Sequence, residues 1–177
     1  MVSSTSRTQR IDPSTISLNE KVVSTRRIAK VVKGGRNLRF NALVVVGNGE
    51  GVVGVGLGKA TAIPDAVRKG TAVARKNLIK VPLKGSTIPQ ATTAKKGGAL
   101  VILKPAPRGT GIVAGSSIRA VMDLVGVKDV VTKSLGSRNP INVIYTTLKA
   151  LSTLRDPAEA IAQRKQIIQP SNVNTGQ

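Results

Sequence analysis

The residues between Lys21 and Gly49 could bind phosphate groups. This stretch has seven basic residues and no acidic residue. The basic residues are Lys21, Arg26, Arg27, Lys30, Lys33, Arg36 and Arg39. They share the stretch with aliphatic strand formers and with a glycine turn at Val31-Val32-Lys33-Gly34-Gly35-Arg36. The pattern predicts a sheet with a positive loop and edge, and the simplest partner for such a surface is a phosphate backbone.

A second group of cations lies on and before a helix expected over residues 63–79. Its members are Arg68, Lys69, Arg75 and Lys76, which lie off the apolar face, and Lys59, which precedes the helix. We expect them to bind RNA with the first group and with Gly34 and Gly35, where a missing Cβ lets the backbone approach closely. Phe40 and Tyr145 are the aromatic residues of the chain. So few rings disfavour stacking of single strands and favour recognition of structured RNA by backbone and shape.

The composition excludes several classes of function. The formal net charge is +20, with +12 in residues 1–86 (16 basic, 4 acidic) and +8 in residues 87–177 (12 basic, 4 acidic), so both halves are expected to touch a polyanion. The absence of Cys and His excludes disulfides and thiolate metal sites and removes the commonest general base. We expect no metal, cofactor or small-molecule substrate. A membrane span is not expected, because no apolar run reaches the roughly 18–20 residues that a bilayer requires.

Two nucleotide-binding motifs are only superficially present. Gly49-Glu50-Gly51-Val52-Val53-Gly54 satisfies G-x-G-x-x-G, but a dinucleotide site needs its third glycine to open a helix. Here a strand is expected to continue to Leu57, so these glycines are assigned to a turn and to close packing of the sheet. Gly58-Lys59 fails as a phosphate-binding P-loop, because Val53 stands where glycine is required and Ala60 where Ser or Thr is required.

The loop from Pro105 to Gly111, which leads to Gly115-Ser116-Ser117 at a helix start, is a stronger candidate for anion binding. Free N–H groups and the helix dipole make such a place attractive to phosphate. The loop resembles the phosphate loop of small-molecule kinases of the galactokinase–homoserine kinase type. Asp123 and Asp129, the nearest downstream carboxylates, show no evident pairing in their helix and strand. The sequence therefore allows phosphate binding here without catalysis, or a tight turn that merely packs.

The expected architecture is α+β with two small domains. The first has strands over 22–32, 36–46 and 52–57 and the helix over 63–79, and a linker over 81–90 follows. The second has a strand over 99–103, a helix over 117–125 capped by Ser116, a strand over 127–134 and a helix capped by Asn139. A capping box at 156–159 opens a short last helix. The expected boundaries are a flexible arm over 1–17, domains over 18–84 and 85–155, and a C-terminal helix with a flexible tail over 156–177.

Long strings of the chain resemble the bacterial-type family of small-subunit ribosomal protein five, from about Asn19 to Leu154. One string is Lys33-Gly34-Gly35-Arg36 followed by Phe40 to Ala60. The other comprises Pro105-Ala106, Gly109 to Gly115, Arg119-Ala120-Val121, Gly136-Ser137 and Asn139 to Asn142. The resemblance implies an N-terminal β-β-β-α domain similar to double-stranded-RNA-binding folds, and a C-terminal split β-α-β domain that the kinases share. A departure is Ser116-Ser117, where a Gly-Gly pair is common.

The same resemblance implies a function and its residues. Such proteins are not enzymes; they bind small-subunit rRNA, line the mRNA entry region, support decoding accuracy and contact small-subunit proteins four and eight. Their glycine turn, here Val32 to Gly35, reaches rRNA near the spectinomycin site. The contact with protein four that influences accuracy maps onto Gly111 and Arg119, and Arg108 and Gly109 lie in the same loop. The expected location is a cytoplasmic ribosome, with an organellar ribosome left open.

Two other functions are compatible with parts of the sequence. A free regulator that binds double-stranded RNA would bind generic duplexes on its own, whereas a ribosomal protein would travel with the small subunit. A small-molecule phosphotransferase would use the loop at Pro105 to Ser117, but the missing His, the few carboxylates and the +20 charge oppose it.

Overall fold

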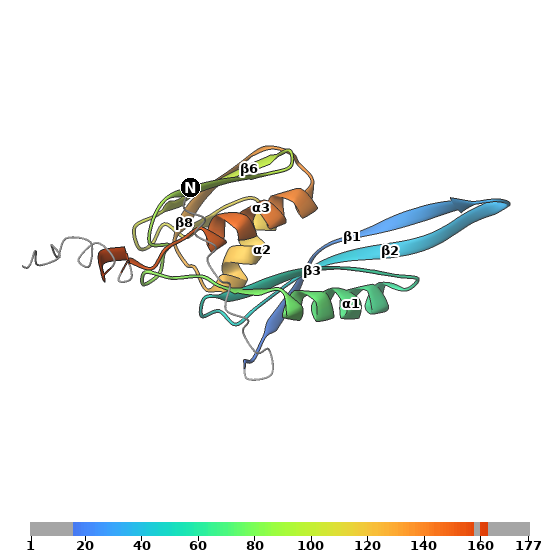
Figure 1. Cartoon of the computed structure of the whole chain (residues 1–177), viewed down its shortest axis with the longest axis horizontal. Helices are drawn as coiled ribbons and strands as arrows, with labels where there is room; N and C mark the ends of the chain where they lie inside the picture. The colour runs from blue at the N-terminus through green and yellow to red at the C-terminus, as the bar shows by residue number, and fades with distance from the viewer. Residues whose placement is uncertain (1–15, 158–159, 163–177) are drawn as a thin grey trace, which may run out of the picture.

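A computed structural model describes residues 16–157 and 160–162, and it confirms the α+β class with two units. The elements are β1 (Asn19–Val32), β2 (Gly35–Gly47), β3 (Val52–Ala60), α1 (Ile63–Lys76), β4 (Leu78–Lys80), β5 (Thr92–Lys96), β6 (Ala99–Pro105), β7 (Ile112–Val113), α2 (Ser116–Val125), β8 (Val130–Gly136) and α3 (Pro140–Ser152). They form two sheets, in the strand orders β1-β2-β3-β4 and β5-β6-β8-β7 (Figure 1).

The first sheet is antiparallel throughout, and its two faces follow the alternation of β2. Ala42, Val44 and Val46 lie in a cluster with α1, whereas Leu43 and Val45 point to the opposite face. The expected helix end was wrong: α1 ends at Lys76, and Leu78–Lys80 form a fourth strand that pairs with β3. Leu78 is buried as a strand residue, and it also stands at the spacing of the apolar helix face, which is why helical periodicity alone extends the helix too far.

Glycines of β3 let α1 lie directly on the strand. A Cβ at Gly56 would overlap the carbonyl oxygen of Gly70, and one at Gly58 would overlap that of Ala66. A Cβ at Gly54 would overlap the carbonyl oxygen of Ala74 in the same way. The assignment of the third motif glycine to packing is therefore confirmed, since β3 runs through it without opening a helix.

In the second sheet, α2 connects the parallel neighbours β7 and β8, and both α2 and α3 pack with the sheet. Asn139 caps α3 as expected, because its side-chain oxygen accepts a hydrogen bond from the N–H of Ile141 at 3.3 Å. Gly115 rather than Ser116 occupies the cap position of α2. β8 begins at Val130 and not at residue 127, and the strands β5 and β7 were not predicted.

The remaining expectations concern the ends of the chain. Residues 1–15 and 163–177, which hold most of the predicted arm and tail, lie outside the described residues. Ile16 is partly buried against the α1 cluster. Of the predicted capping box, residues 158–159 are not described, while residues 157 and 160–162 are helical.

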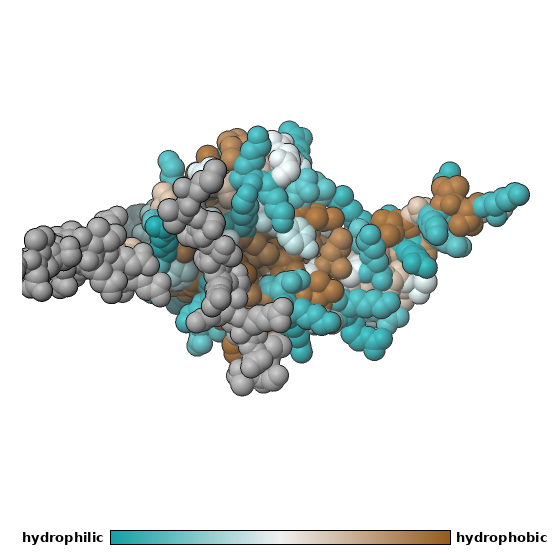
Figure 2. Space-filling view, viewed as in Figure 1, coloured by the Kyte–Doolittle hydropathy of each residue, from teal (hydrophilic) through white to brown (hydrophobic). Residues whose placement is uncertain are grey.

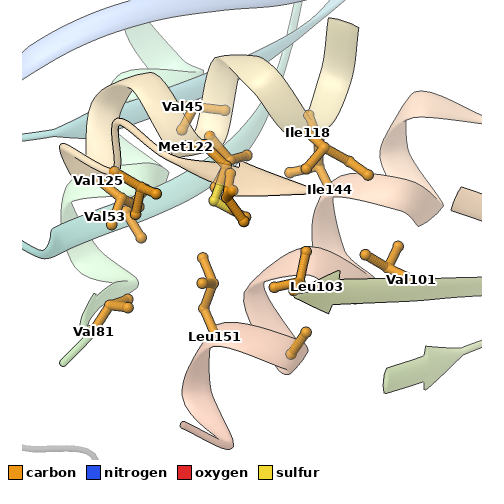
Figure 3. Close-up of a cluster of buried hydrophobic side chains, with 14 of the residues drawn as sticks. Val45, Val53, Val81, Val101, Leu103, Ile118, Met122, Val125, Ile144 and Leu151 are labelled. Carbon is orange, nitrogen blue, oxygen red and sulfur yellow. The ribbon is translucent and has the colours of Figure 1, made fainter. Parts of the chain in front are cut away.

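The two units share one continuous hydrophobic core (Figure 3). Val45 and Val53 of the first sheet lie in the same cluster as Met122 of α2 and Leu151 of α3. The expected linker is part of this body, since Ile88 is 0% exposed within it.

Backbone hydrogen bonds join the same two units. Gly49 N–H donates to the Leu124 carbonyl at 2.9 Å, and Gly51 N–H donates to the Val125 carbonyl at 2.8 Å. The first sheet is thus held between α1 on one face and α2 on the other.

Candidate nucleic-acid interface

A two-stranded ribbon projects from the body and carries much of the predicted charge. β3 ends at Ala60, which pairs with Phe40, so residues 28–39 of β1 and β2 pair only with each other. We call residues 28–39 the ribbon; it is the long blue projection in Figure 1. Five residue pairs at roughly 3.4 Å each carry its turn about 17 Å beyond the sheet.

The turn at the end of the ribbon is tight and open to solvent. Lys33 and Gly34 form it, because Val32 pairs with Gly35. Gly34 has φ of 96°, a conformation that other residues rarely adopt, whereas Gly35 has no such restriction. No heavy atom lies within 4 Å of a Cβ placed at either glycine. The turn therefore contributes nothing to the core, and its backbone is free to approach a partner.

The ribbon and its base carry cations on both faces. One face of the sheet is the face that α1 covers nearer the body. On this face of the ribbon and its base, Arg27 pairs with Phe40 and Val31 pairs with Arg36. The opposite face carries Arg26, Lys30, Arg39 and Lys59. Lys33 lies at the turn between the two faces. A projection that is positive on both sides can meet phosphate on both sides.

Hydrophobic side chains lie exposed among these cations. Val31 is 74% exposed and Leu38 is 50% exposed, and hydrophobic residues are visible near the end of the projection in Figure 2. Exposed apolar area on an extended element indicates a surface that another molecule covers.

The other predicted RNA contacts fall into two groups. Lys69, Arg75 and Lys76 are exposed on α1, away from the ribbon. Lys21 and Arg68 already have acidic partners: Lys21 Nζ lies 2.9 Å from Asp123 Oδ2 on α2, and Arg68 Nη2 lies 3.3 Å from Asp65 Oδ1. The pair of Lys21 with Asp123 was not predicted, because it joins residues 102 positions apart.

The aromatic side chains do not form a stacking platform. Phe40 is partly buried at the base of the ribbon, and the Lys96 ammonium group lies 4.8 Å from the centre of the Tyr145 ring, far along the chain from the ribbon. This placement supports contact through charge and backbone shape.

The glycine loop before α2 is built around an internal anion. Asp129 Oδ1 accepts hydrogen bonds from the N–H groups of Gly109 and Gly111, each at 3.0 Å. Asp129 therefore binds the loop itself, and two of the N–H groups that could hold a phosphate are occupied. Asp123 instead pairs with Lys21. These pairings are hidden in the sequence, because 18 to 20 positions separate the loop glycines from Asp129 and 102 positions separate Lys21 from Asp123.

Hydrogen bonds lower the pKa of Asp129 below its ordinary value of 3.8. The Ser86 hydroxyl contributes most, the N–H groups of Gly111 and Gly109 add to it, and the Arg108 guanidinium contributes by its charge, while burial acts in the opposite direction. Because Asp129 is only 5% exposed and its backbone N–H also donates to the Ser86 carbonyl at 3.0 Å, it joins the glycine loop to the segment between the two units.

Arg119, Gly109 and Gly111 lie on the solvent-facing side of the same loop. Arg119 Nη2 donates to the Ile112 carbonyl at 2.7 Å and so holds α2 to β7. Gly109 and Gly111 have φ of 92° and 74°, and no heavy atom lies within 4 Å of a Cβ at either position. Arg108 is exposed beside them. The four predicted protein-contact residues thus lie on one short, accessible segment and the first turn of α2.

Metal and membrane features are absent from the part of the chain that the structure describes. No group of three or more His, Cys, Asp or Glu residues gathers there to hold a metal ion. None of its helices combines the length and hydrophobicity needed to cross a bilayer.

Comparison with known proteins decides the family. Residues 18–82 match the model of the ribosomal protein S5 N-terminal domain, and residues 94–165 match that of the S5 C-terminal domain. The chain belongs to the ribosomal protein S5 family. It is 48% identical over 157 residues to small ribosomal subunit protein uS5 of Dehalococcoides mccartyi strain CBDB1, which covers 89% of this chain and 91% of that protein. It is 47% identical over 156 residues to the uS5 protein of Chloroflexus aurantiacus, with 88% of each covered.

Membership of the S5 family confirms that this chain is a ribosomal protein with a structural and not an enzymatic role. The two family matches correspond to the two structural units. The first match includes the ribbon and α1, and the second includes the glycine loop and α2. The resemblance noted in the sequence is therefore confirmed at the level of the family.

Proposed function

We propose that this S5 protein is a structural constituent of the small ribosomal subunit and that its ribbon binds small-subunit rRNA. The observation that carries the proposal is the ribbon itself, which projects from the body, is positive on both faces and ends in an open turn formed by Lys33 and Gly34. The ribbon's form suits insertion between two stretches of RNA backbone, with phosphates neutralised on both sides.

Specificity in this arrangement comes from shape. Double-stranded RNA is recognised mainly through its backbone and form. The ribbon offers Lys30, Lys33 and Arg36 for phosphates, and Val31 and Leu38 for the sugar surface between them. The cations Lys69, Arg75 and Lys76 on α1 would bind a separate stretch of rRNA.

The glycine loop and Arg119 are proposed as a contact with small-subunit protein four. Open space around Gly109 and Gly111 allows a neighbouring chain to approach, and Arg119 fixes the loop edge to α2. A change at Arg119 or Gly111 would then loosen this contact and alter decoding accuracy. The protein would also contact protein eight and line the mRNA entry region of a cytoplasmic ribosome.

The salt dependence of binding tests the RNA contact. For full-length chains on small-subunit rRNA, the triple change of Lys30, Lys33 and Arg36 to Gln is expected to reduce the slope of log affinity against log salt by about 0.7–0.9 per lost phosphate contact. Replacing Lys104 and Lys133 by Gln removes charge from a different surface and should leave the slope nearly unchanged. A flat salt dependence of the unmodified chain would contradict the proposal. Failure to sediment with small subunits would favour a free RNA-binding regulator.

A further inference from the structure

A small cleft lies where the turn between β5 and β6 meets α3. Lys96 and Gly97 of the turn and Asn142 and Tyr145 of α3 line this cleft, and its volume is about 320 Å³. We call these four residues the hairpin cleft. Gly97 leaves its mouth open, because no heavy atom lies within 4 Å of a Cβ placed there. The cleft belongs to the second unit, where β6 and α3 lie next to each other (Figure 1), and it is separate from the ribbon and from the glycine loop.

Hydrogen bonds hold the two walls of the hairpin cleft together. Lys149 Nζ on α3 donates to the Lys95 carbonyl on β5 at 3.0 Å. The buried Thr146 hydroxyl donates to the Asn142 carbonyl at 2.7 Å and also lies 3.4 Å from the Lys96 carbonyl. The helix and the hairpin are thus fixed to each other on the inner side of the cleft, so its shape exists before any ligand arrives.

The hairpin cleft brings together an aromatic ring, an amide and an ammonium group. The Tyr145 ring is partly buried against the core, and the Lys96 ammonium group lies 4.8 Å from the ring centre. Among the described residues, the Asn142 side chain has only a long hydrogen bond, from Nδ2 to the Ser137 hydroxyl at 3.5 Å. The amide therefore keeps a donor and its acceptor oxygen for a ligand. Asn142 and Tyr145 are three residues apart on α3, which places them on the same side of the helix.

The charge around the hairpin cleft is positive. Exposed Lys149 lies one turn beyond the ring on α3, and exposed Arg138 lies next to the hairpin turn, because the preceding N–H donates to the Gly98 carbonyl at 2.9 Å. No acidic residue occurs in residues 92–105 or 130–155, which include β5, β6, β8 and α3. An anionic ligand would meet no carboxylate from these elements.

We propose that the hairpin cleft binds one unpaired nucleotide of small-subunit rRNA. The base stacks on the Tyr145 ring, the Asn142 amide binds the base edge, and the Lys96 ammonium group turns from the ring to the phosphate. Unstacked RNA bases are bound in this way, by an aromatic face and by hydrogen bonds to the base edge. Stacking of a base on a ring is worth more than an exposed cation–π contact, so the exchange is favourable. The choice of rRNA as the source rests on the proposed function.

The chemistry of the hairpin cleft favours a nucleotide over an acidic peptide. The cations would attract either ligand, but the face of an aromatic ring carries partial negative charge and does not attract a carboxylate. A nucleotide uses the ring, the amide and the cation together. A single ring holds a single base, so this site differs from a platform on which successive bases stack.

Ultraviolet crosslinking in assembled small subunits tests the proposal. Trypsin cuts after Arg138 and Lys149, so Tyr145 is recovered in the peptide 139–149. Mass spectrometry is expected to find this peptide with a nucleotide attached at Tyr145, and reverse transcription is expected to stop at one rRNA position. Tyr145→Phe keeps the ring and should retain the crosslink. Tyr145→Leu should abolish it and should raise the reactivity of the same nucleotide toward a base-modifying reagent by about fivefold or more, because the base loses its stacking partner.

Two neighbouring lysines of β5 provide a matched control. Lys96 lies on the side of the strand that meets the ring, whereas Lys95 points to the opposite side, because successive strand residues alternate. Lys96→Gln is expected to lower the yield of the 139–149 crosslink about two- to fivefold, as the loss of an exposed ion pair does. Lys95→Gln should leave the yield unchanged. Equal effects of the two changes would point to general loss of charge and would overturn the assignment of the cleft.

The outcomes separate the two proposals. If ribbon peptides carry nucleotides in the assembled subunit and the peptide 139–149 carries none, the cleft proposal alone is overturned; an acidic peptide in the cleft would give this result. An unmodified chain that does not travel with small subunits overturns the proposed function and the cleft proposal with it.

Discussion

At the scale of single residues, Asp129 takes the place that a bound anion would take in the glycine loop. Its carboxylate accepts two backbone N–H groups and a Ser86 hydrogen bond, with Arg108 nearby. The loop is therefore held in shape by the protein's own charge. In this loop, which resembles a kinase phosphate site, two of the N–H groups that could bind phosphate are consequently occupied by the protein's own carboxylate.

The carboxylate gives this loop a defined pH response. Because the folded pKa of Asp129 lies below its ordinary value of 3.8, its contribution to stability is present above that value and is lost as pH falls through the folded pKa. Asp129→Asn is expected to lower Tm at pH 7 and to flatten the fall of Tm between pH 4 and more acidic conditions. Thermal unfolding of both full-length chains across this range provides the measurement. Equal Tm values at pH 7 would show that the carboxylate does not hold the loop.

The basic residues themselves could be predicted from the sequence, but their pairing could not. The excess of Lys and Arg around the glycine turn can be read directly from the sequence. The pair of Lys21 with Asp123 depends on how α2 docks against β1, across 102 positions. Such contacts arise from the packing of distant elements, so composition and spacing carry no trace of them.

At the scale of elements, glycine has two opposite uses in the first sheet. In β3, Gly58 lets the backbone of α1 touch the strand, and a Cβ there would overlap the Ala66 carbonyl oxygen. In the ribbon, Gly35 has open space and no positive φ. The first kind of glycine fixes the helix on the sheet, and the second leaves room for a partner.

The two uses predict different costs for the same substitution. Gly58→Ala is expected to reduce the free energy of unfolding by about 1–3 kcal/mol, as overpacking does. Gly35→Ala should change it by about 0.5 kcal/mol or less, as at other open surface positions. Denaturant unfolding of the full-length chains measures both. If Gly35→Ala were as costly as Gly58→Ala, the ribbon would have to be a packing element.

Elements with strong periodicity were the ones that the sequence predicted. The alternation along β2 matched the structure, and all three helices were predicted, although helical periodicity carried the first one past its observed end at Lys76. β5 has the polar sequence Thr-Thr-Ala-Lys-Lys and β7 has only two residues, so neither carries a pattern of its own. Both exist because a neighbouring strand pairs with them.

At the scale of the whole molecule, the two units form one body around a shared core. Leu43, Val45, Val53 and Val55 of the first sheet are at most 1% exposed, and they lie in the cluster that includes Met122 of α2. This arrangement means that the ribbon and the glycine loop are held in a fixed relation. The Pro and Gly residues between the units are typical of a linker, and nothing in their pattern indicates that Ile88 is buried.

The shared core predicts that the first unit does not fold well alone. In a fragment of residues 1–84, the face of the sheet that α2 covers would be exposed to water. Each Å² of apolar area buried on folding stabilises a protein by about 25 cal/mol, so the fragment would lose a large part of its stabilisation. We expect it to lack the cooperative thermal transition of the full-length chain, as monitored by circular dichroism. A cooperative transition at the same Tm would contradict a common core.

The central claim, that the ribbon tip lies within rRNA, can be tested from a single position. The chain has no cysteine, so Lys33→Cys provides one attachment point for an iron chelate that releases hydroxyl radicals. In assembled small subunits, rRNA is expected to be cut at a compact set of nucleotides, well above the cutting by free chelate. The absence of rRNA cutting above that background, from subunits that contain the modified chain, would contradict the account.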